Sequence, residues 1–242
     1  MAIQPNMRYG TTARALEQGT FDAGLRAHML RVFNYMVIGL VITGLVAFGT
    51  ASSPTMMQAI FGTPLKWVVM LAPLAFVFFL SFKVETISAS TAQLLFFVFS
   101  GVMGLSLAVI FAVFTGESVA RVFFITSAMF GAMSLYGYTT NADLSKFGSF
   151  LMMGLIGIVI ASLVNIFVGS SALQFAISVI GVLVFTGLTA YDTQRIKEMY
   201  AEHNGSEGNN KLAVMGALSL YLNFINLFTM LMQLLGVRTS NH

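Results

Sequence analysis

The sequence predicts an all-α polytopic membrane protein with seven transmembrane helices, and three observations support this fold class. Of the 242 residues, 57% are hydrophobic and 9% are charged, whereas soluble domains average about 25% charged residues. The mean hydropathy is +0.85. Apolar runs recur at lengths that can cross a bilayer, which takes about 17 to 25 helical residues. There are too few polar side chains to coat a water-exposed globule, so the lipid bilayer must surround most of the protein.

The apolar runs define a membrane domain over residues 33–236. They cover residues 33–53, 66–83, 92–115, 119–139, 147–169, 172–194 and 212–236. The connections at 116–118 and 169–171 are so short that the runs on either side must be antiparallel neighbours. Pro73 interrupts the second run, but membrane helices tolerate proline. We therefore expect seven helices that alternate in direction.

Two short ends flank this domain. Residues 1–32 carry several charges and lack the apolar stretch of a cleavable secretory signal, so we expect a cytoplasmic tail, with an interfacial helix as the alternative. Residues 237–242 form a short C-terminal tail. The one sizeable loop, 198–211, is rich in turn-forming residues and is expected to be a mobile cytoplasmic connector.

Basic residues predict the orientation of the bundle. The side that holds the N-terminus has nine of the twelve Lys and Arg residues: Arg8, Arg14, Arg26, Arg31, Lys83, Lys146, Arg195, Lys197 and Lys211. The other side has the remaining three, Lys66, Arg121 and Arg238. The positive-inside rule then places the N-terminus in the cytoplasm and the C-terminus outside. A re-entrant last segment is the alternative that would change this assignment, and the polar residues within that segment leave it open.

Most membrane enzymes need groups that this sequence lacks. It has no cysteine, which excludes disulfides and thiolate catalysis. Its histidines, His28, His203 and His242, lie in predicted tails or loops, so no intramembrane base and no histidine metal cluster are expected. Asp192 is the only acid within a predicted span, and an intramembrane aspartyl protease needs two. We predict a protein that is not an enzyme and has no cofactor. The scattered basic residues also predict no nucleic-acid partner.

Polar side chains form stripes on the last two predicted spans. In the seventh span the stripe has steps of four and three residues, so it follows one face of a helix that should not meet lipid; it consists of Ser219, Asn223, Asn226, Met230 and Gln233. In the sixth span the stripe consists of Ser178, Phe185, Thr189 and Asp192. Facing each other, the two stripes would line a narrow hydrophilic path. Alternatively, their hydroxyls and amides only join helices, at about 0.6 to 2 kcal/mol each.

Asp192 has two competing interpretations. An ionisable residue at membrane depth indicates function, while an interfacial pair with Arg195, one turn further on, would be structural. At 1.5 Å per residue, Asp192 lies about 28 Å into its span and Asn223 about 16 Å into the next, so the two need not touch. Lys83 is expected to extend to the membrane interface, or to reach inward to Asp192.

The chain resembles bacterial members of the Bax inhibitor motif family over nearly its whole length. The matching stretches are residues 31–35 (RVFNY), 127–141 (SAMFGAMSLYGYTTN), 148–151 (GSFL), 188–197 (LTAYDTQRIK) and 216–228 (GALSLYLNFINLF). The last two stretches are specific to this family. The resemblance implies a fold in which six helices surround a central, fairly polar seventh, and it implies the cytoplasmic (inner) membrane of a bacterium as the location.

Members of this family resemble pH-sensitive calcium leak channels, in which two aspartates share a proton and a basic residue of the second helix binds one of them. Carried over by motif, the first aspartate is Asp192 and the basic residue is Lys83. The second aspartate is replaced here by Asn223. Two carboxylates in contact cannot both ionise cheaply, but an Asp–Asn pair lacks this repulsion. We therefore expect a blunter pH response, or one at lower pH, and a weaker hold on calcium.

Two functions follow as hypotheses. The first is a passive path for calcium or other cations, lined by Asp192, Asn223, Asn226 and Ser219, gated near Asp192, with Arg195 as a further latch partner. Calcium would bind transiently at Asp192 and no cofactor would stay bound. The second is a non-conducting modulator that binds a membrane-anchored AAA protease through residues 1–32. Proton-coupled transport fits less well, because no internal repeat is visible.

Overall fold

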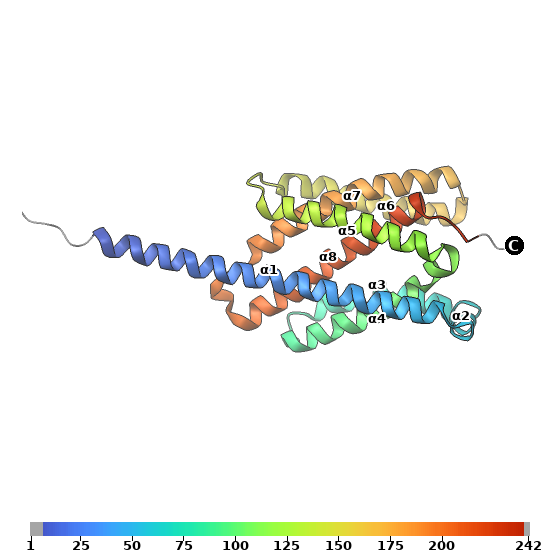
Figure 1. The fold of residues 1–242 in the computed structure, drawn as a ribbon, viewed down its shortest axis with the longest axis horizontal. Helices are drawn as coiled ribbons and strands as arrows, with labels where there is room; N and C mark the ends of the chain where they lie inside the picture. The colour runs from blue at the N-terminus through green and yellow to red at the C-terminus, as the bar shows by residue number, and fades with distance from the viewer. Residues whose placement is uncertain (1–6, 240–242) are drawn as a thin grey trace, which may run out of the picture.

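The structure is a computed structural model that describes residues 7–239, with the side chains from Asp22 onward except that of Glu202. Its elements within this range are α1 (Met7–Ala51), α2 (Pro54–Phe61), α3 (Leu65–Lys83), α4 (Ala89–Val113), α5 (Gly116–Thr139), α6 (Ser145–Val168), α7 (Ser171–Met199), η1 (Glu202–Asn204) and α8 (Gly205–Leu235). Seven of the described helices, all but α2 and η1, are long and apolar enough to cross a membrane (Figure 1). The predicted all-α polytopic fold is confirmed.

The helix ends differ from the prediction at the first and last spans. Helix α1 begins at Met7, so most of the predicted tail, residues 1–32, is helical and continuous with the first span. The proposed contact of this tail with a partner protein falls largely on residues whose side chains lie outside the described range. The predicted connector 198–211 is much shorter, because α7 extends to Met199 and α8 begins at Gly205. Gly205 has a φ of 66°, which favours glycine and reverses the chain within a few residues.

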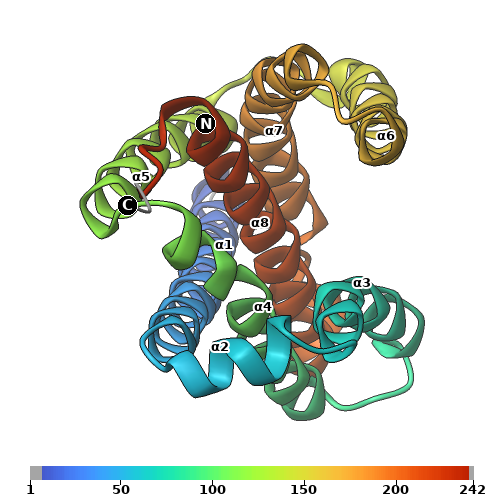
Figure 2. The same cartoon turned by 90° about the vertical axis from the view of Figure 1, so that its right-hand side faces the viewer.

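Helix α8 lies at the centre of the bundle (Figure 2). In its most apolar stretch 67% of residues are buried, against at most 39% in the other six spans. Its main packing partners are α1, α4, α5 and α7, while α3 packs on α4 and α6 packs on α7. The prediction of a central seventh span is thus confirmed, and four of the six other spans form its immediate wall.

Tyr221 fixes α8 against α1 and α4. Its side chain is fully buried, and its hydroxyl lies 2.6 Å from Oγ1 of Thr43 on α1. The rings of Phe96 and Phe99 on α4 contact Tyr221 edge-on, each with a centroid distance of 5.6 Å. Edge-to-face aromatic pairs and a satisfied hydroxyl stabilise a buried tyrosine. These contacts orient α8 so that its opposite face meets α7.

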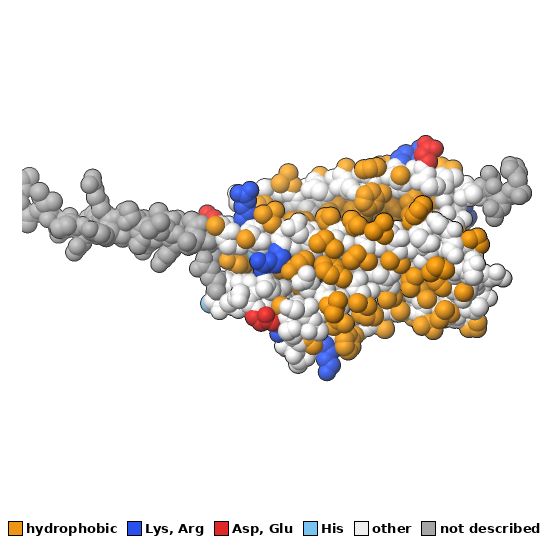
Figure 3. Space-filling view, turned by 60° about the horizontal axis from the view of Figure 1, so that its bottom comes forward, with side chains coloured by type: hydrophobic (Ala, Val, Ile, Leu, Met, Phe, Trp, Pro, Cys, Tyr) orange, Lys and Arg blue, Asp and Glu red, His pale blue; other side chains and the backbone are white. Residues whose placement is uncertain are grey.

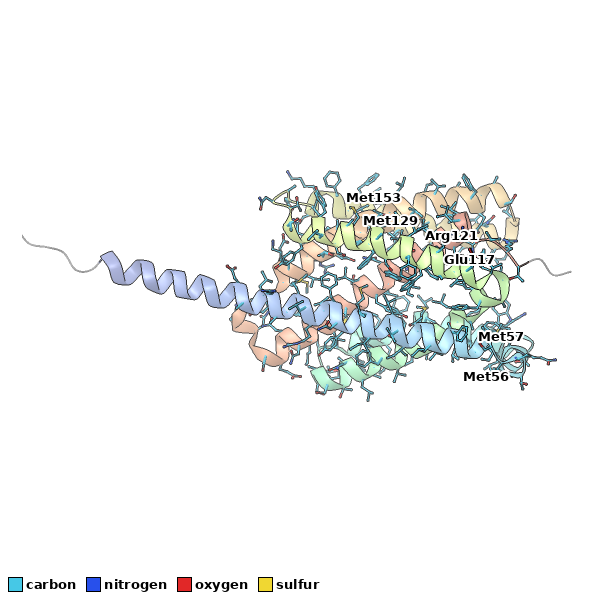
Figure 4. All side chains as sticks on the ribbon, in the orientation of Figure 1. Met56, Met57, Glu117, Arg121, Met129 and Met153 are labelled. Atoms are coloured by element: carbon cyan, nitrogen blue, oxygen red, sulfur yellow. The ribbon has the colours of Figure 1, made fainter. Side chains whose placement is uncertain are left out.

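The two ends of the bundle differ in their loops and charges. We call the end with residues 84–88, 140–144 and 200–204 the inner end, and the opposite end, with the C-terminus, the outer end. Apolar side chains cover the surface between the ends, and charged side chains gather at the ends (Figure 3). Glu117 and Arg121 lie on α5 at the outer end (Figure 4). The inner end is the one that the basic residues predict to be cytoplasmic.

A short clasp holds the C-terminal segment at the outer end. Phe114 and Arg238 form an antiparallel bridge, and the backbone N–H of Thr115 donates to the carbonyl of Val237 at 2.9 Å. The N–H of Thr239 donates to the carbonyl of Val113 at the same distance. Residues 237–239 of the predicted C-terminal tail are therefore joined to the α4–α5 connection, and the rest of that tail lies outside the described residues.

Helices α5 and α7 approach each other closely at Gly137. A Cβ atom added there would lie 2.2 Å from the carbonyl oxygen of Ala190. We expect Gly137→Ala to destabilise the fold by about 1 to 3 kcal/mol, because the two backbones would have to separate. Thermal unfolding in detergent would show this as a lowered midpoint. Gly101→Ala on α4 is the control, since its Cβ would meet nothing within 4 Å; equal midpoints for the two variants would contradict the prediction.

Candidate functional site

Asp192 of α7 and two side chains of α8 form a buried polar cluster. The hydroxyl of Ser219 and the Nδ2 amide of Asn223 both donate to Oδ2 of Asp192, each at 2.7 Å. Asp192 and Asn223 are both buried. The two residues are therefore in contact, which their depths along the two helices had left open. Spacing along each helix gave their depths, but it does not determine how two helices are staggered against each other.

The side chain of Asp192 lines a cavity. Both hydrogen bonds go to Oδ2, so Oδ1 has no hydrogen-bond donor among the described residues. Asp192 and Ser219 line a cavity of about 690 Å³ that extends to the inner end of the bundle, where Asn204 and Lys211 also line it. The carboxylate therefore borders a space that a cation or water can enter, and only one of its oxygens is bonded to α8.

Neighbouring residues of the 188–197 stretch hold α7 in place. The side chain of Gln194 accepts from the N–H of Leu144 at 2.9 Å and donates to the carbonyl of Ala142 at 2.8 Å. The ammonium group of Lys197 donates to the carbonyl of Tyr138 at 2.9 Å. Both contacts join α7 to the end of α5 and the loop after it. They fix the rotation of α7 and so direct Asp192 toward α8.

His28 is a site residue that the sequence reasoning placed in the N-terminal tail. It is 3% exposed within α1, and it lines the same cavity as Asp192. Neither ring nitrogen has a hydrogen-bond partner within the described residues, and the ring packs 5.3 Å from that of Tyr200. A signal was present in the sequence: His28 continues the buried stripe of α1, which consists of Leu25, Met29, Val32 and Met36.

Hydrogen bonds near the inner end of the cavity join α8 to the connection between α3 and α4 and to the start of α4. The carboxylate of Glu207 accepts from the N–H of Ala89 at 2.7 Å, and Lys211 donates to the carbonyl of Glu85 at 3.2 Å. Arg31 of α1 donates to the side chain of Asn210. Helix α8 is therefore attached to α1, to α4 and to the α3–α4 connection at the inner end.

The outer side of the cluster is closed. Outward of Asp192 on α7, Leu188 and Phe185 are buried. Outward of Asn223 on α8, the buried side chains include Leu227 and Phe228. Apolar packing therefore separates the cavity from the outer end.

Three hydroxyls of α7 do not extend the polar cluster. Ser178 donates to Gln174, Thr189 to Phe185 and Thr193 to Thr189, in each case to a backbone carbonyl one turn earlier. These groups are satisfied within their own helix. The expected hydrophilic path between two facing stripes is thus reduced to the contacts of Asp192.

Other predicted site residues lie apart from Asp192 or at its edge. Asn226 donates to the carbonyl of Leu222 in its own helix at 2.8 Å. Gln233 is exposed, which corrects the expectation that the whole stripe avoids lipid. Lys83 is exposed at the end of α3, and the cavity is lined by its neighbours Val84 and Glu85. Arg195 is exposed, lines the cavity and interacts electrostatically with Asp192.

Metal ligands are sparse in this site. Across the described part of the chain, no group of three or more His, Cys, Asp or Glu side chains is placed to hold a metal ion. Asp192 is the single carboxylate of the buried cluster, and calcium typically takes six to eight oxygen ligands. A cation at this position would keep most of its hydration shell.

Comparison with known proteins agrees with this architecture. The family model described as inhibitor of apoptosis-promoting Bax1 matches residues 25–240. An uncharacterized protein of Rickettsia prowazekii is 49% identical over 219 residues, which cover 90% of this chain and 93% of that protein. Inner membrane protein YbhL of Escherichia coli is 47% identical over 219 residues, which cover 89% of this chain and 94% of the relative. The chain, a multi-pass membrane protein, therefore belongs to the Bax inhibitor family.

Proposed function

We propose that this protein is a leak channel for cations, calcium first among them, in a bacterial inner membrane, with its gate at Asp192. The observation that carries the proposal is the carboxylate of Asp192, which lines a cavity of about 690 Å³ and accepts hydrogen bonds from α8 through one of its two oxygens. Charged groups inside a membrane protein are costly to bury, so a buried carboxylate beside a cavity favours ion binding over packing.

The surroundings of the cavity suit a slow leak. Glu85 and Asp192 contribute negative charge to its wall, while Arg195 and Lys211 contribute positive charge. Cations are therefore not concentrated strongly, and Asp192 supplies the attraction at the closed end. Passage to the outer side requires α7 and α8 to separate outward of Asp192, because buried apolar side chains such as Leu188 and Leu227 fill that region. We infer that this packed arrangement would be the closed state of the channel.

Calcium uptake by proteoliposomes tests the proposal. We expect vesicles that contain the protein to take up calcium at least about fivefold faster than protein-free vesicles of the same lipid at pH 7, a ratio equal to about 1 kcal/mol. Uptake at the protein-free rate at every pH from 5 to 8 would exclude conduction and leave a non-conducting role. Magnesium and sodium in the same assay give the selectivity among cations.

His28 should give this leak a dependence on pH. Histidine is the side chain whose charge changes between pH 5 and 8, and its neighbours in or beside the cavity are Arg31, Tyr200, Arg195, Lys211, Glu85 and Asp192. A protonated His28 adds a positive charge that repels cations, so calcium flux should fall about threefold as the pH decreases from 6.5 to 5.

Substituting His28 isolates this contribution. His28→Gln keeps a polar side chain without the ionisable ring, and we expect it to remove most of the threefold decrease. His203→Gln is the control, because His203 is exposed in η1. Calcium flux is measured at both pH values for each protein. If the flux through His28→Gln falls as much as the flux through the natural protein, another group causes the pH dependence.

A further inference from the structure

A groove on the lipid-facing surface separates α1 from α5. Each of these helices packs on α8, and α8 lies behind both of them in Figure 1. The groove between them has a volume of about 850 Å³, and Phe130 and Phe224 are among the residues that line it. Gly44 on α1 and Gly131 on α5 also line the groove, and a Cβ atom at either position would meet nothing within 4 Å. The missing side chains leave room for a ligand.

The groove runs along the direction in which the helices cross the membrane. On α1 its lining extends from Arg26 to Leu45, about 28 Å at 1.5 Å per residue. The hydrocarbon core of a bilayer is about 30 Å thick. The walls of the groove are apolar over most of this length, and exposed side chains of α1 such as Leu30, Val41 and Leu45 form one rim. Such a shape fits an extended acyl chain.

Polar groups gather at the inner end of the groove. Arg26 lines it there and is exposed. Tyr138 lines it from α5, and the ammonium group of Lys197 lies 5.3 Å from the centre of the Tyr138 ring. Two cationic side chains therefore lie near the place where a lipid headgroup would emerge. A guanidinium group binds phosphate through paired hydrogen bonds.

One buried hydroxyl in the groove lacks a partner. Ser134 is 5% exposed and lines the groove, and its Oγ has no hydrogen bond within the described part of the chain. Buried polar groups are satisfied in most structures, so an unsatisfied one indicates a missing ligand or water. Ser134 precedes Tyr138 by one helical turn, about 6 Å deeper in the membrane. The ester carbonyl of a phospholipid lies at this depth relative to its phosphate.

We propose that the groove between α1 and α5 binds one anionic phospholipid, with its phosphate at Arg26, an ester carbonyl at Ser134 and an acyl chain along Gly44 and Gly131. A transmembrane helix from a second copy or another protein would also cover apolar surface. However, a helix has no phosphate for Arg26, and its backbone carbonyls are already bonded within the helix. The proposal does not depend on ion conduction.

Lipid binding to the purified, delipidated full chain tests this site. We expect native mass spectrometry to detect one phosphatidylglycerol per chain, bound at least about fivefold more tightly than phosphatidylcholine. Arg26→Gln should weaken phosphatidylglycerol binding about tenfold, and Ser134→Ala about threefold. Lys146→Gln is the control, because Lys146 is an exposed cation of α6 at the same end of the bundle and lies outside the groove; it should change binding less than twofold.

A second pair of variants tests the acyl chain. Gly131→Leu should fill the groove and abolish phosphatidylglycerol binding, whereas Gly157→Leu on α6, where a Cβ also meets nothing within 4 Å, should not affect it. Three results would overturn the proposal. The first is equal phosphatidylglycerol binding by Arg26→Gln and Lys146→Gln, and the second is displacement of the lipid by millimolar glycerol phosphate alone. The third is a dimer that Gly131→Leu converts to monomer, because that result would assign the groove to a partner helix.

Discussion

Asp192→Asn should reduce calcium uptake by proteoliposomes about tenfold or more at pH 7. The substitution removes the only carboxylate of the buried cluster but keeps its shape, and the new amide oxygen can still accept hydrogen bonds from Ser219 and Asn223. Two unit charges 4 Å apart interact by about 4 kcal/mol at an effective dielectric constant of 20. A tenfold change in uptake corresponds to about 1.4 kcal/mol. About a third of the interaction between the carboxylate and a cation would therefore account for the expected loss.

A control for this experiment removes a negative charge elsewhere at the inner end. Asp143 lies in the exposed loop before α6. Hydrogen bonds from the backbone N–H and the side chain of Ser145 hold the pKa of Asp143 below its usual value, so it stays ionised from pH 5 to 8. Asp143→Asn should leave uptake within about twofold of the natural protein. If both variants reduced uptake equally, surface charge and not the site at Asp192 would control the flux.

Asn223→Asp should lower the half-saturating calcium concentration about tenfold at pH 8 and leave it nearly unchanged at pH 5. The Nδ2 atom of Asn223 lies 2.7 Å from Oδ2 of Asp192, so the variant brings two carboxylates into contact. Such a pair keeps one proton up to a higher pH than a lone carboxylate does. The shared proton limits the negative charge of the pair at low pH, and its loss at pH 8 adds a second negative charge that the natural site lacks.

The control places the new carboxylate one turn away. The amide of Asn226 donates to the carbonyl of Leu222 and not to Asp192. The half-saturating calcium concentration of Asn226→Asp, divided by that of the natural protein, should therefore be the same at every pH. Calcium titrations of flux at pH 5, 6, 7 and 8 measure these ratios. A ratio for Asn223→Asp that is the same at every pH would show that the second carboxylate does not share a proton with Asp192.

The membrane-spanning segments could be predicted from the sequence, because a long apolar run along the chain directly indicates a segment that is buried in lipid. The spans at 66–83 and 119–139 agree with α3 and α5 within three residues at each end. The start of the first span and the loop before α8 were both mispredicted, and for the loop the contacts of its polar residues give the reason. Polar residues such as Asn209 and Asn210 resemble a loop in sequence, but Asn209 donates to the carbonyl of Ala201 and Asn210 accepts from Arg31. These partners satisfy the two amides, and α8 begins at Gly205, earlier than predicted.

His28 shows the same limit within the candidate site. A histidine near the N-terminus of a membrane protein is usually solvated, and its burial depends on Tyr200, which is distant in sequence and packs against it. The distance between Asp192 and Asn223 likewise depends on the stagger of α7 against α8. Their contacts with other helices, such as those of Gln194 and Tyr221, set that stagger.

The sequence by itself determined that the protein crosses the membrane seven times, that its family is the Bax inhibitor family, and that Asp192 is the acid on which the site depends. These properties follow from composition, from periodicity and from motifs that are local in the chain. The tertiary structure alone decided which polar groups meet: Ser219 and Asn223 bind Asp192, His28 joins the cavity, and Asn226 bonds within its own helix, as do Ser178, Thr189 and Thr193. The physical reason is that a buried polar group is satisfied by whichever donor or acceptor the packing of helices brings near, and that packing is a property of the whole bundle.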